Sequence, residues 1–188
     1  IRKAIILASM GVVGVAGANY FYYLAISKST VATAILLQYT APVLVMFYLV
    51  LRGEEKVSTY KIIALGASLF GCFLAVSGGT LTAFTLSPVG ILLGGLSAFC
   101  FAFLTVFGRK VSVGDTVWES LIYTLGFAAL FWMIIQSPLK IYQAHFSLED
   151  WEYFFLFAMI SVFILYIFYF KGLREIEASR AVITSTFE

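Results

Sequence analysis

The sequence predicts an all-α protein, a polytopic bundle of transmembrane helices. Of its 188 residues, 62% are hydrophobic, and the mean hydropathy of +0.99 is too high for a water-soluble domain of this length. The apolar residues fall in long runs, each close to the roughly 20 residues that a helix needs to cross a bilayer. Ten of the twelve Lys and Arg residues lie in alternate gaps between these runs. This alternation is typical of membrane-spanning segments with a fixed orientation.

Each complete run is expected to form a helix, because the bilayer interior offers backbone groups no water to bond. The runs are Ala4–Ile26, Thr30–Leu51, Tyr60–Ser77, Val89–Phe107, Trp118–Gln136 and Trp151–Phe170. The gap Pro138–Asp150 alternates apolar and polar residues and favours a short helix at the membrane surface. A seventh run begins at Ala178 and reaches Glu188 after only ~15 Å of helix. We therefore expect a fragment of a longer protein.

The cationic residues predict the orientation of these spans. They lie before the first run and after the second, fourth and sixth runs: Arg2, Lys3, Arg52, Lys56, Lys61, Arg109, Lys110, Lys171, Arg174 and Arg180. Short loops rich in Lys and Arg stay in the cytoplasm. We expect an integral protein of the cytoplasmic (inner) membrane with residue 1 on the cytoplasmic side. The basic residues thus serve orientation, and the expected partner is the lipid bilayer, with no nucleic acid.

The chain contains a short internal repeat at an offset of 147 residues. Phe21–Tyr23 aligns with Phe168–Phe170, and Ala34–Leu36 aligns with Ala181–Ile183. The two copies are five spans apart, an odd number, so they enter the membrane from opposite sides. Inverted repeats of this kind are common in secondary transporters.

Three stretches carry a resemblance to a known family: Tyr23–Ala34, Gln38–Pro42 and Gly53–Ser58, which includes Glu55. They resemble the EamA branch of the drug/metabolite transporter superfamily, although Ala64 stands where the family has glycine. The resemblance implies ten spans in two inverted five-helix units, of which this chain holds about seven. Residues 1–83 then form the latter part of the first unit. Residues 84–188 form the second unit, truncated in its fourth span.

Polar residues inside the spans are the candidates for solute binding, because polar groups in hydrocarbon are costly. Asn19 and Gln38 lie about equally far from the turn between the first two spans, and the repeat maps them onto Tyr166 and Ser185. Four polar positions thus converge on the midplane, where inverted-repeat transporters bind their substrates. The alternative is that Asn19 and Gln38 only join helices by hydrogen bonds.

Further candidates lie near this layer. Pro42 breaks its helix and frees backbone near Gln38 and Tyr39, either to line a cavity or to bend the span for packing. Ser97 and Tyr123 are expected to line the same cavity, although helix hydroxyls often bond their own carbonyls. Glu188, an acid deep in a span, is the candidate for proton coupling, because burial disfavours its charged form.

Small residues recur at helix-packing spacing in three stripes. These stripes are Gly11, Gly14 and Gly17; Gly90 and Gly94; and Ala67 and Gly71. Such stripes let helices approach closely. They are expected inside the bundle, with a homodimer surface as the alternative.

The sequence therefore predicts a carrier for a small metabolite, amino-acid-like or otherwise polar or amphipathic, that works by alternating access and acts as an exporter. The rivals are a membrane scaffold or receptor subunit without transport, and a membrane-embedded enzyme. An enzyme needs paired acids, a His cluster or a Ser/Lys dyad within the spans, and the sequence has none there. No catalytic residues, metal or cofactor are expected.

Overall fold

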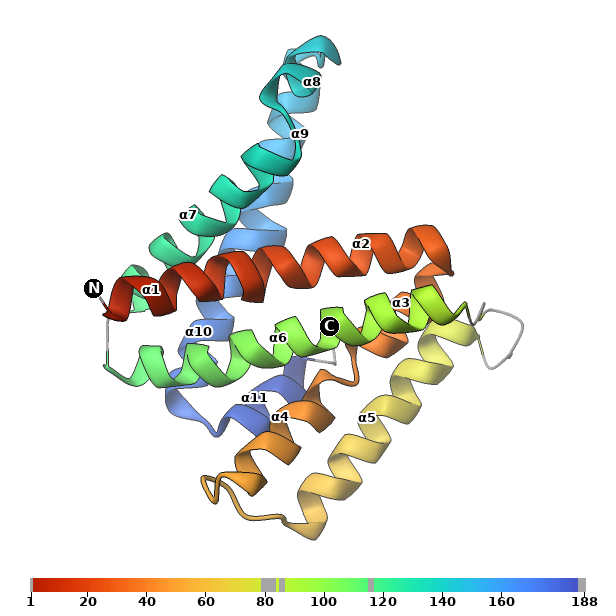
Figure 1. Cartoon of the computed structure of the whole chain (residues 1–188), viewed down its shortest axis with the longest axis vertical. Helices are drawn as coiled ribbons and strands as arrows, with labels where there is room; N and C mark the ends of the chain where they lie inside the picture. Colours follow the sequence, from red (N-terminus) through yellow and green to blue (C-terminus); the bar gives the residue numbers. More distant parts are fainter. Residues whose placement is uncertain (1, 79–83, 85–86, 115–116, 186–188) are drawn as a thin grey trace.

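The computed structural model of the chain describes residues 2–78, 84, 87–114 and 117–185, and these form a bundle of helices (Figure 1). Among them, six helical segments are long and apolar enough to cross a membrane: Lys3–Lys28, Val31–Leu51, Thr59–Ser77, Pro88–Val111, Val117–Ile135 and Leu148–Glu175. The six predicted spans are confirmed, with ends that differ by a few residues.

The sixth span differs most from its prediction, because it begins three residues earlier and ends five residues later. Its start is set by a capping box in which Ser147 Oγ accepts a hydrogen bond from the Asp150 amide (3.2 Å). The Asp150 carboxylate in turn accepts one from the Ser147 amide (2.9 Å). This reciprocal pair satisfies the first amides of the helix and fixes where it begins. The gap before it holds the predicted short helix, α8 (Pro138–Gln143).

Three spans are interrupted along their length. The first consists of α1 (Arg2–Ser9), a π-helical segment (Met10–Gly17) and α2 (Ala18–Lys28). The sixth has the same plan, with α9 (Leu148–Ala158), a π-helical segment (Met159–Ile164) and α10 (Leu165–Glu175). The second is divided at Tyr39–Thr40 into α3 (Val31–Gln38) and α4 (Ala41–Leu51).

The bounds of these elements repeat at the offset found in the sequence. α10 begins and ends 147 residues after α2, and α11 (Ala178–Thr184) begins 147 residues after α3. A π-helical segment stands immediately before both α2 and α10. Such segments are frequent at functional sites. The starts of α2 and α3 and of α10 and α11 are therefore separated by the same number of residues.

The central helix of the bundle is α6 (Pro88–Gly114), which packs against α2, α3, α4, α10 and α11. Small residues permit this packing, as predicted for two of the three stripes. A methyl group at Gly14 would lie 3.0 Å from Leu104, and one at Gly94 would lie 2.6 Å from Leu37. The third stripe is different, because a methyl group at Gly71 would meet nothing within 4 Å. Gly71 on α5 (Thr59–Ser77) therefore faces outward.

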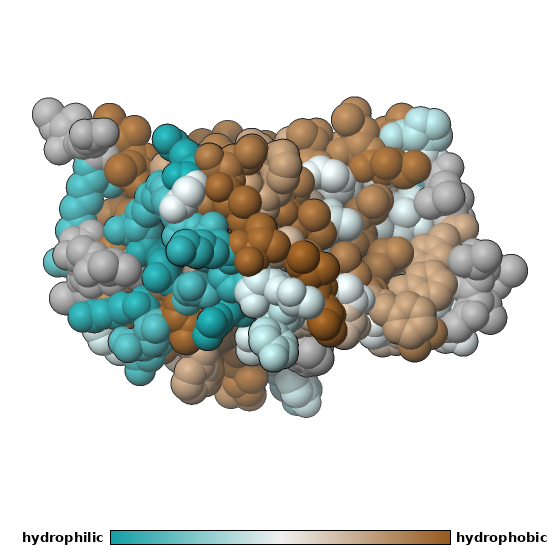
Figure 2. All heavy atoms as spheres, turned by 90° about the horizontal axis from the view of Figure 1, so that it is seen from below, coloured by the Kyte–Doolittle hydropathy of each residue, from teal (hydrophilic) through white to brown (hydrophobic). Residues whose placement is uncertain are grey.

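Charged residues gather toward one end of the bundle. In the view from below, this end lies on the left and shows many hydrophilic residues, whereas much of the remaining surface is apolar (Figure 2). Here α1 and α7 (Val117–Ile135) begin, and α4 and α6 end (Figure 1). Ion pairs join Lys3 to Glu119 (3.0 Å) and Lys110 to Glu54 (3.1 Å). The end that the sequence predicts to be cytoplasmic is thus rich in charge.

Candidate solute-binding cavity

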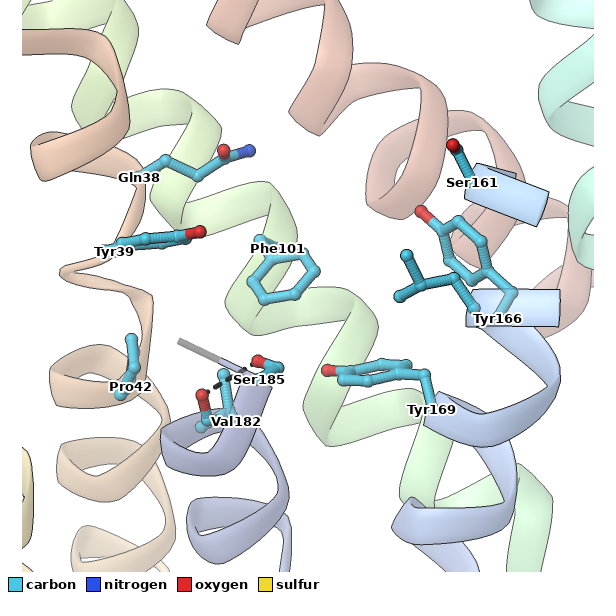
Figure 3. Close-up of a pocket in the computed structure, with 10 residues that line it drawn as sticks. Gln38, Tyr39, Pro42, Phe101, Ser161, Tyr166, Tyr169, Val182 and Ser185 are labelled. Atoms are coloured by element: carbon cyan, nitrogen blue, oxygen red, sulfur yellow. Dashed lines mark hydrogen bonds between the residues drawn. The ribbon is translucent and has the colours of Figure 1, made fainter. Parts of the chain in front are cut away.

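A cavity of about 230 Å³ lies between the broken second span and the helices α6, α10 and α11 (Figure 3). We call it the central cavity. Its lining residues are Gln38, Tyr39, Pro42, Phe101, Ser161, Leu165, Tyr166, Tyr169, Val182 and Ser185. Five of these were predicted from the sequence, namely Gln38, Tyr39, Pro42, Tyr166 and Ser185. The cavity brings together residues from both copies of the repeat.

The break in the second span exposes one wall of the cavity. Pro42 has no amide hydrogen, so the carbonyl of Gln38 cannot receive the usual helical bond from residue 42. α3 ends at Gln38, and α4 starts afresh at Ala41 with Pro42 in its first turn. Tyr39 lies in the break, and its hydroxyl points into the cavity (Figure 3).

Ser97 holds the Gln38 side chain from outside the cavity. Its hydroxyl is fully buried, donates to the carbonyl of Ala18 (2.9 Å) and accepts from the Gln38 amide nitrogen (3.0 Å). Because the amide nitrogen is engaged in this way, the carbonyl oxygen of Gln38 is left to accept hydrogen bonds. Ser97 therefore positions a lining residue without lining the cavity itself.

The opposite wall is fixed by similar internal bonds. The hydroxyls of Tyr169 and Thr105 lie 2.5 Å apart, and Thr105 donates its own hydrogen to the carbonyl of Phe101 (2.9 Å). Thr105 therefore accepts from Tyr169. Ser185 donates to the carbonyl of Val182 (2.9 Å), a bond drawn in Figure 3. The Ser185 hydroxyl oxygen keeps lone pairs that can accept hydrogen bonds from a ligand.

These bonds give the central cavity a defined chemical character. The oxygens of Gln38 and Ser185 are acceptors, and the ring centres of Phe101 and Tyr169 lie 5.8 Å apart. Among the described residues, no charged side chain lines the cavity. An acceptor-rich wall beside aromatic faces suits a solute with N–H or O–H groups and an apolar part.

Asn19 lies in a neighbouring cavity and does not line the central one. This lateral cavity, of about 580 Å³, is lined by residues of α2, α7 and the sixth span, among them Asn19, Trp132, Ser161 and Tyr166. Ser161 and Tyr166 line both cavities, so the two adjoin. The amide of Asn19 donates to the carbonyl of Val15 in its own span (2.9 Å).

Two further predicted residues lie elsewhere. Tyr123 stands on α7 with 54% of its surface exposed, and it lines neither the central nor the lateral cavity. Glu188, the predicted coupling residue, lies outside the described residues.

Five lining residues were not among the predicted set: Phe101, Ser161, Leu165, Tyr169 and Val182. Tyr169 carried a detectable pattern, because it occupies the aligned aromatic triplet, one position after Phe168. Phe101 carried none, because α6 lies outside the matched segments.

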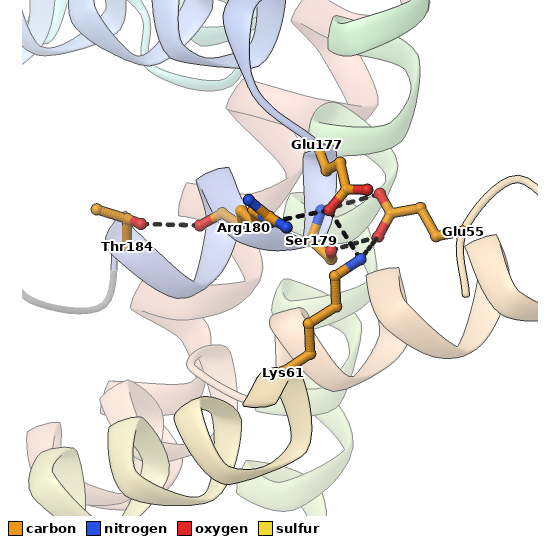
Figure 4. A network of polar contacts seen from close by, with 6 residues as sticks. All are labelled: Glu55, Lys61, Glu177, Ser179, Arg180 and Thr184. Carbon is orange, nitrogen blue, oxygen red and sulfur yellow. Dashed lines mark hydrogen bonds and ion pairs between the residues drawn. The ribbon is translucent and has the colours of Figure 1, made fainter. Parts of the chain in front are cut away.

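A cluster of charged and polar residues lies between α5 and the start of α11 (Figure 4). We call it the Glu55 cluster; its members are Glu55, Lys61, Glu177, Ser179 and Arg180. Lys61 pairs with Glu55 (2.8 Å) and Glu177 (2.9 Å), and Ser179 donates to Glu55 through its hydroxyl. Only 7% of the Glu55 side chain and 10% of the Lys61 side chain are exposed. The cluster therefore contains a buried ion pair.

The Glu55 cluster and the central cavity are joined by a single short helix. α11 begins beside Glu177, carries Val182 in the cavity wall and ends beside Ser185. The pKa of Glu177 lies below its ordinary value, because Lys61 donates a hydrogen bond to its carboxylate and Lys61 and Arg180 are positively charged. Glu177 is therefore ionised at neutral pH, and the cluster is held by opposite charges.

The described residues contain no group of three or more His, Cys, Asp or Glu side chains that could hold a metal ion.

Comparison with known proteins places this chain among membrane transporters. A family described as the EamA-like transporter family matches residues 1–77 and 88–188. An uncharacterized inner membrane transporter, YicL, of Salmonella typhimurium strain LT2 is 27% identical over 191 residues, which cover 100% of this chain and 62% of the relative. An uncharacterized transporter of Archaeoglobus fulgidus is 25% identical over 167 residues, 89% of this chain and 57% of the relative. The chain thus spans about three fifths of the length of these relatives. No solved structure matches it.

Proposed function

The chain belongs to the EamA-like transporter family, and from this premise we propose that it moves a small amphipathic metabolite across the cytoplasmic membrane by alternating access. The observation that carries the proposal is the central cavity. It is lined by Gln38 and Tyr39 from one copy of the repeat and by Tyr166 and Ser185 from the other. Inverted-repeat transporters bind their solutes at such junctions.

The repeated element bounds support an inverted architecture for the carrier. The copies that contain α2–α3 and α10–α11 are separated by an odd number of spans, so they cross the membrane in opposite senses. Two related units of opposite sense can exchange their conformations, and the exchange opens a shared cavity first to one side and then to the other. In this proposal residue 1 is cytoplasmic and the direction of transport is export.

The chemistry of the wall supports a solute class. The Gln38 carbonyl oxygen and the Ser185 hydroxyl oxygen can accept hydrogen bonds, because both residues use a hydrogen of their own in their bonds within the protein. A solute that offers amine or hydroxyl hydrogens satisfies them, and its apolar part contacts Phe101 and the tyrosine rings. Amino-acid-like solutes and other small amphipathic molecules meet both conditions.

The Glu55 cluster acts in this proposal as the cytoplasmic gate. It connects the loop after the second span to the start of α11, which is one segment from each copy of the repeat (Figure 4). Separation of these segments frees α11, which carries Val182 of the cavity wall and is followed directly by Ser185. Intact ion pairs hold the cavity closed toward the cytoplasm, and their separation opens it.

Metabolite profiles of cells test the transport proposal. Cells that overproduce the parent protein are compared with cells that overproduce Gln38→Ala, Ser185→Ala or Asn19→Ala. Loss of one wall hydrogen bond is expected to lower transport about tenfold for Gln38→Ala. Asn19→Ala is expected to have a smaller effect, since Asn19 lines the lateral cavity. Ser27→Ala, at an exposed hydroxyl that bonds the Leu24 carbonyl, is the control.

The export direction has its own measurement. Solute identified from these profiles is added to inside-out membrane vesicles, where an exporter accumulates it in the lumen. If profiles of producing and lacking cells are identical, and the vesicles take up nothing, the chain is not a carrier. Uptake only into right-side-out vesicles shows that the chain is a carrier that imports its solute, which contradicts the proposed export direction.

A further inference from the structure

A groove runs along the outer surface between α4 and α6, separate from the central cavity. We call it the α4–α6 groove. It has a volume of about 400 Å³ and is lined by Leu44, Phe47, Tyr48, Leu51, Phe99, Ala102, Phe103, Val106 and Phe107. None of these residues lines the central cavity. Tyr48 supplies the one side-chain polar atom of the lining, so the groove is suited to a hydrocarbon chain.

The groove faces outward along its length. Phe47 is 65% exposed, Leu51 is 70% exposed and Phe99 is 59% exposed. Both helices belong to segments that are long and apolar enough to cross a membrane, so an acyl chain of the bilayer can enter the depression between them.

Two cations stand at the charged end of the groove, and both lie close to the ring of Tyr48. Arg52 Nε donates to the Tyr48 hydroxyl (3.2 Å), and its guanidinium carbon lies 5.6 Å from the centre of the Tyr48 ring. Lys110 Nζ lies 5.9 Å from the same centre. Arg52 immediately follows the last residue of α4, and Lys110 lies near the end of α6. Each of the two helices therefore places one cation at this end of the groove.

Among the described residues, Glu54 is the carboxylate that pairs with Lys110 and acts on Arg52, and one carboxylate against two cations leaves an excess of positive charge. Glu54 pairs with Lys110 (3.1 Å), and both side chains are about two fifths exposed. An exposed pair of this kind contributes little to stability, so Lys110 can exchange Glu54 for another anion. The site thus combines an apolar channel in the membrane with a net positive end at the predicted cytoplasmic surface.

From this arrangement we infer that the α4–α6 groove is a binding site for an anionic phospholipid. The acyl chain lies in the groove over Phe99 and Phe103, and the phosphate lies between Arg52 and Lys110 beside Tyr48. Basic pockets between transmembrane helices on the cytoplasmic side bind anionic headgroups in this way. A zwitterionic headgroup brings its own cation to Arg52 and Lys110 and is therefore bound less tightly.

Lipid titration of the purified protein tests this inference. Phosphatidylglycerol and phosphatidylethanolamine with identical acyl chains are added to the detergent-solubilised protein, and bound lipid is measured by native mass spectrometry. Each cation near a membrane surface is expected to contribute about fivefold to the affinity for the anionic lipid. Arg52→Gln and Lys110→Gln are thus expected to weaken phosphatidylglycerol binding about fivefold each, and about thirtyfold together. Lys171→Gln, at an exposed lysine of α10 outside the groove, is the matched control and is expected to change nothing.

Two further arms identify the source of the phosphate and the role of the groove. Glycerol 3-phosphate carries the headgroup without acyl chains, and it is expected not to displace phosphatidylglycerol at equal concentration. Equal binding of the two phospholipids, or equal binding by the parent and the double variant, overturns the inference. Efficient displacement by glycerol 3-phosphate also overturns it and leaves a simple anion site. A protein that binds neither phospholipid also overturns the inference.

Discussion

Replacement of Lys61 by glutamine is expected to open the central cavity toward the cytoplasm. Lys61 bonds Glu55 at 2.8 Å and Glu177 at 2.9 Å, and the Lys61 and Glu55 side chains are 10% and 7% exposed. Removing one partner of a buried pair leaves the other charge uncompensated, at a cost of about 3 kcal/mol. If the gate interpretation is right, this cost falls on the closed state, and the open fraction rises about a hundredfold.

Cysteine labelling measures this change. Ser185→Cys is introduced with Cys72 and Cys100 replaced by alanine, and a membrane-impermeant thiol reagent is added to inside-out vesicles. Labelling of the parent background is expected to be slow, and Lys61→Gln is expected to accelerate it by up to about a hundredfold. The control is Lys3→Gln, which breaks a pair whose side chains are about half exposed and is expected to change the rate by no more than about fivefold. Equal labelling rates in Lys61→Gln and Lys3→Gln refute the reasoning.

Three further outcomes follow from the described contacts. Gly94→Ala is expected to lower the thermal midpoint in detergent, because the added methyl group would lie 2.6 Å from Leu37; Gly71→Ala, where nothing lies within 4 Å, is expected to leave it unchanged or raise it. Ser97→Ala is expected to raise the KM for transport several-fold and to change kcat less, because the Gln38 side chain loses its hydrogen bond to Ser97. An unchanged KM contradicts the positioning role. Because the pKa of Glu177 is lowered, its contribution to the closed gate is present above its ordinary pKa and is lost as pH falls through the lowered value. The thiolate fraction of the introduced cysteine itself rises with pH, and this effect cancels in the ratio of the Ser185→Cys labelling rates measured with and without Lys61→Gln. That ratio is expected to be constant from about pH 6 to 8, and a marked change of the ratio in that interval contradicts the assignment.

The helices and half of the cavity wall followed from local properties of the sequence. Spans are set by runs of apolar residues, which depend only on neighbours along the chain. Gln38 and Pro42 were predicted because a polar side chain and a proline are both unusual in the middle of a span. Ser185 and Tyr166 were found through the repeat, which transfers the depth of one residue to another.

The remaining features depend on how helices turn about their axes, which the sequence leaves undetermined. Asn19 lines the lateral cavity and not the central one, because the position of a residue along a helix does not determine the side of the helix on which it lies. Tyr123 has a polar group at a suitable depth but stands on the exposed side of α7. The bond between Glu55 and Ser179 joins residues 124 positions apart. Long-range pairs of this kind have no local pattern.

Solute affinity of the purified protein tests most directly whether the central cavity binds the transported molecule. A solute identified from the metabolite profiles is titrated into the parent, Gln38→Ala and Tyr123→Ala. Gln38 lines the central cavity, whereas Tyr123 is an exposed polar residue outside it. The account predicts a Kd about tenfold higher for Gln38→Ala and an unchanged Kd for Tyr123→Ala. Parent-like affinity in Gln38→Ala, or a greater loss in Tyr123→Ala, contradicts it.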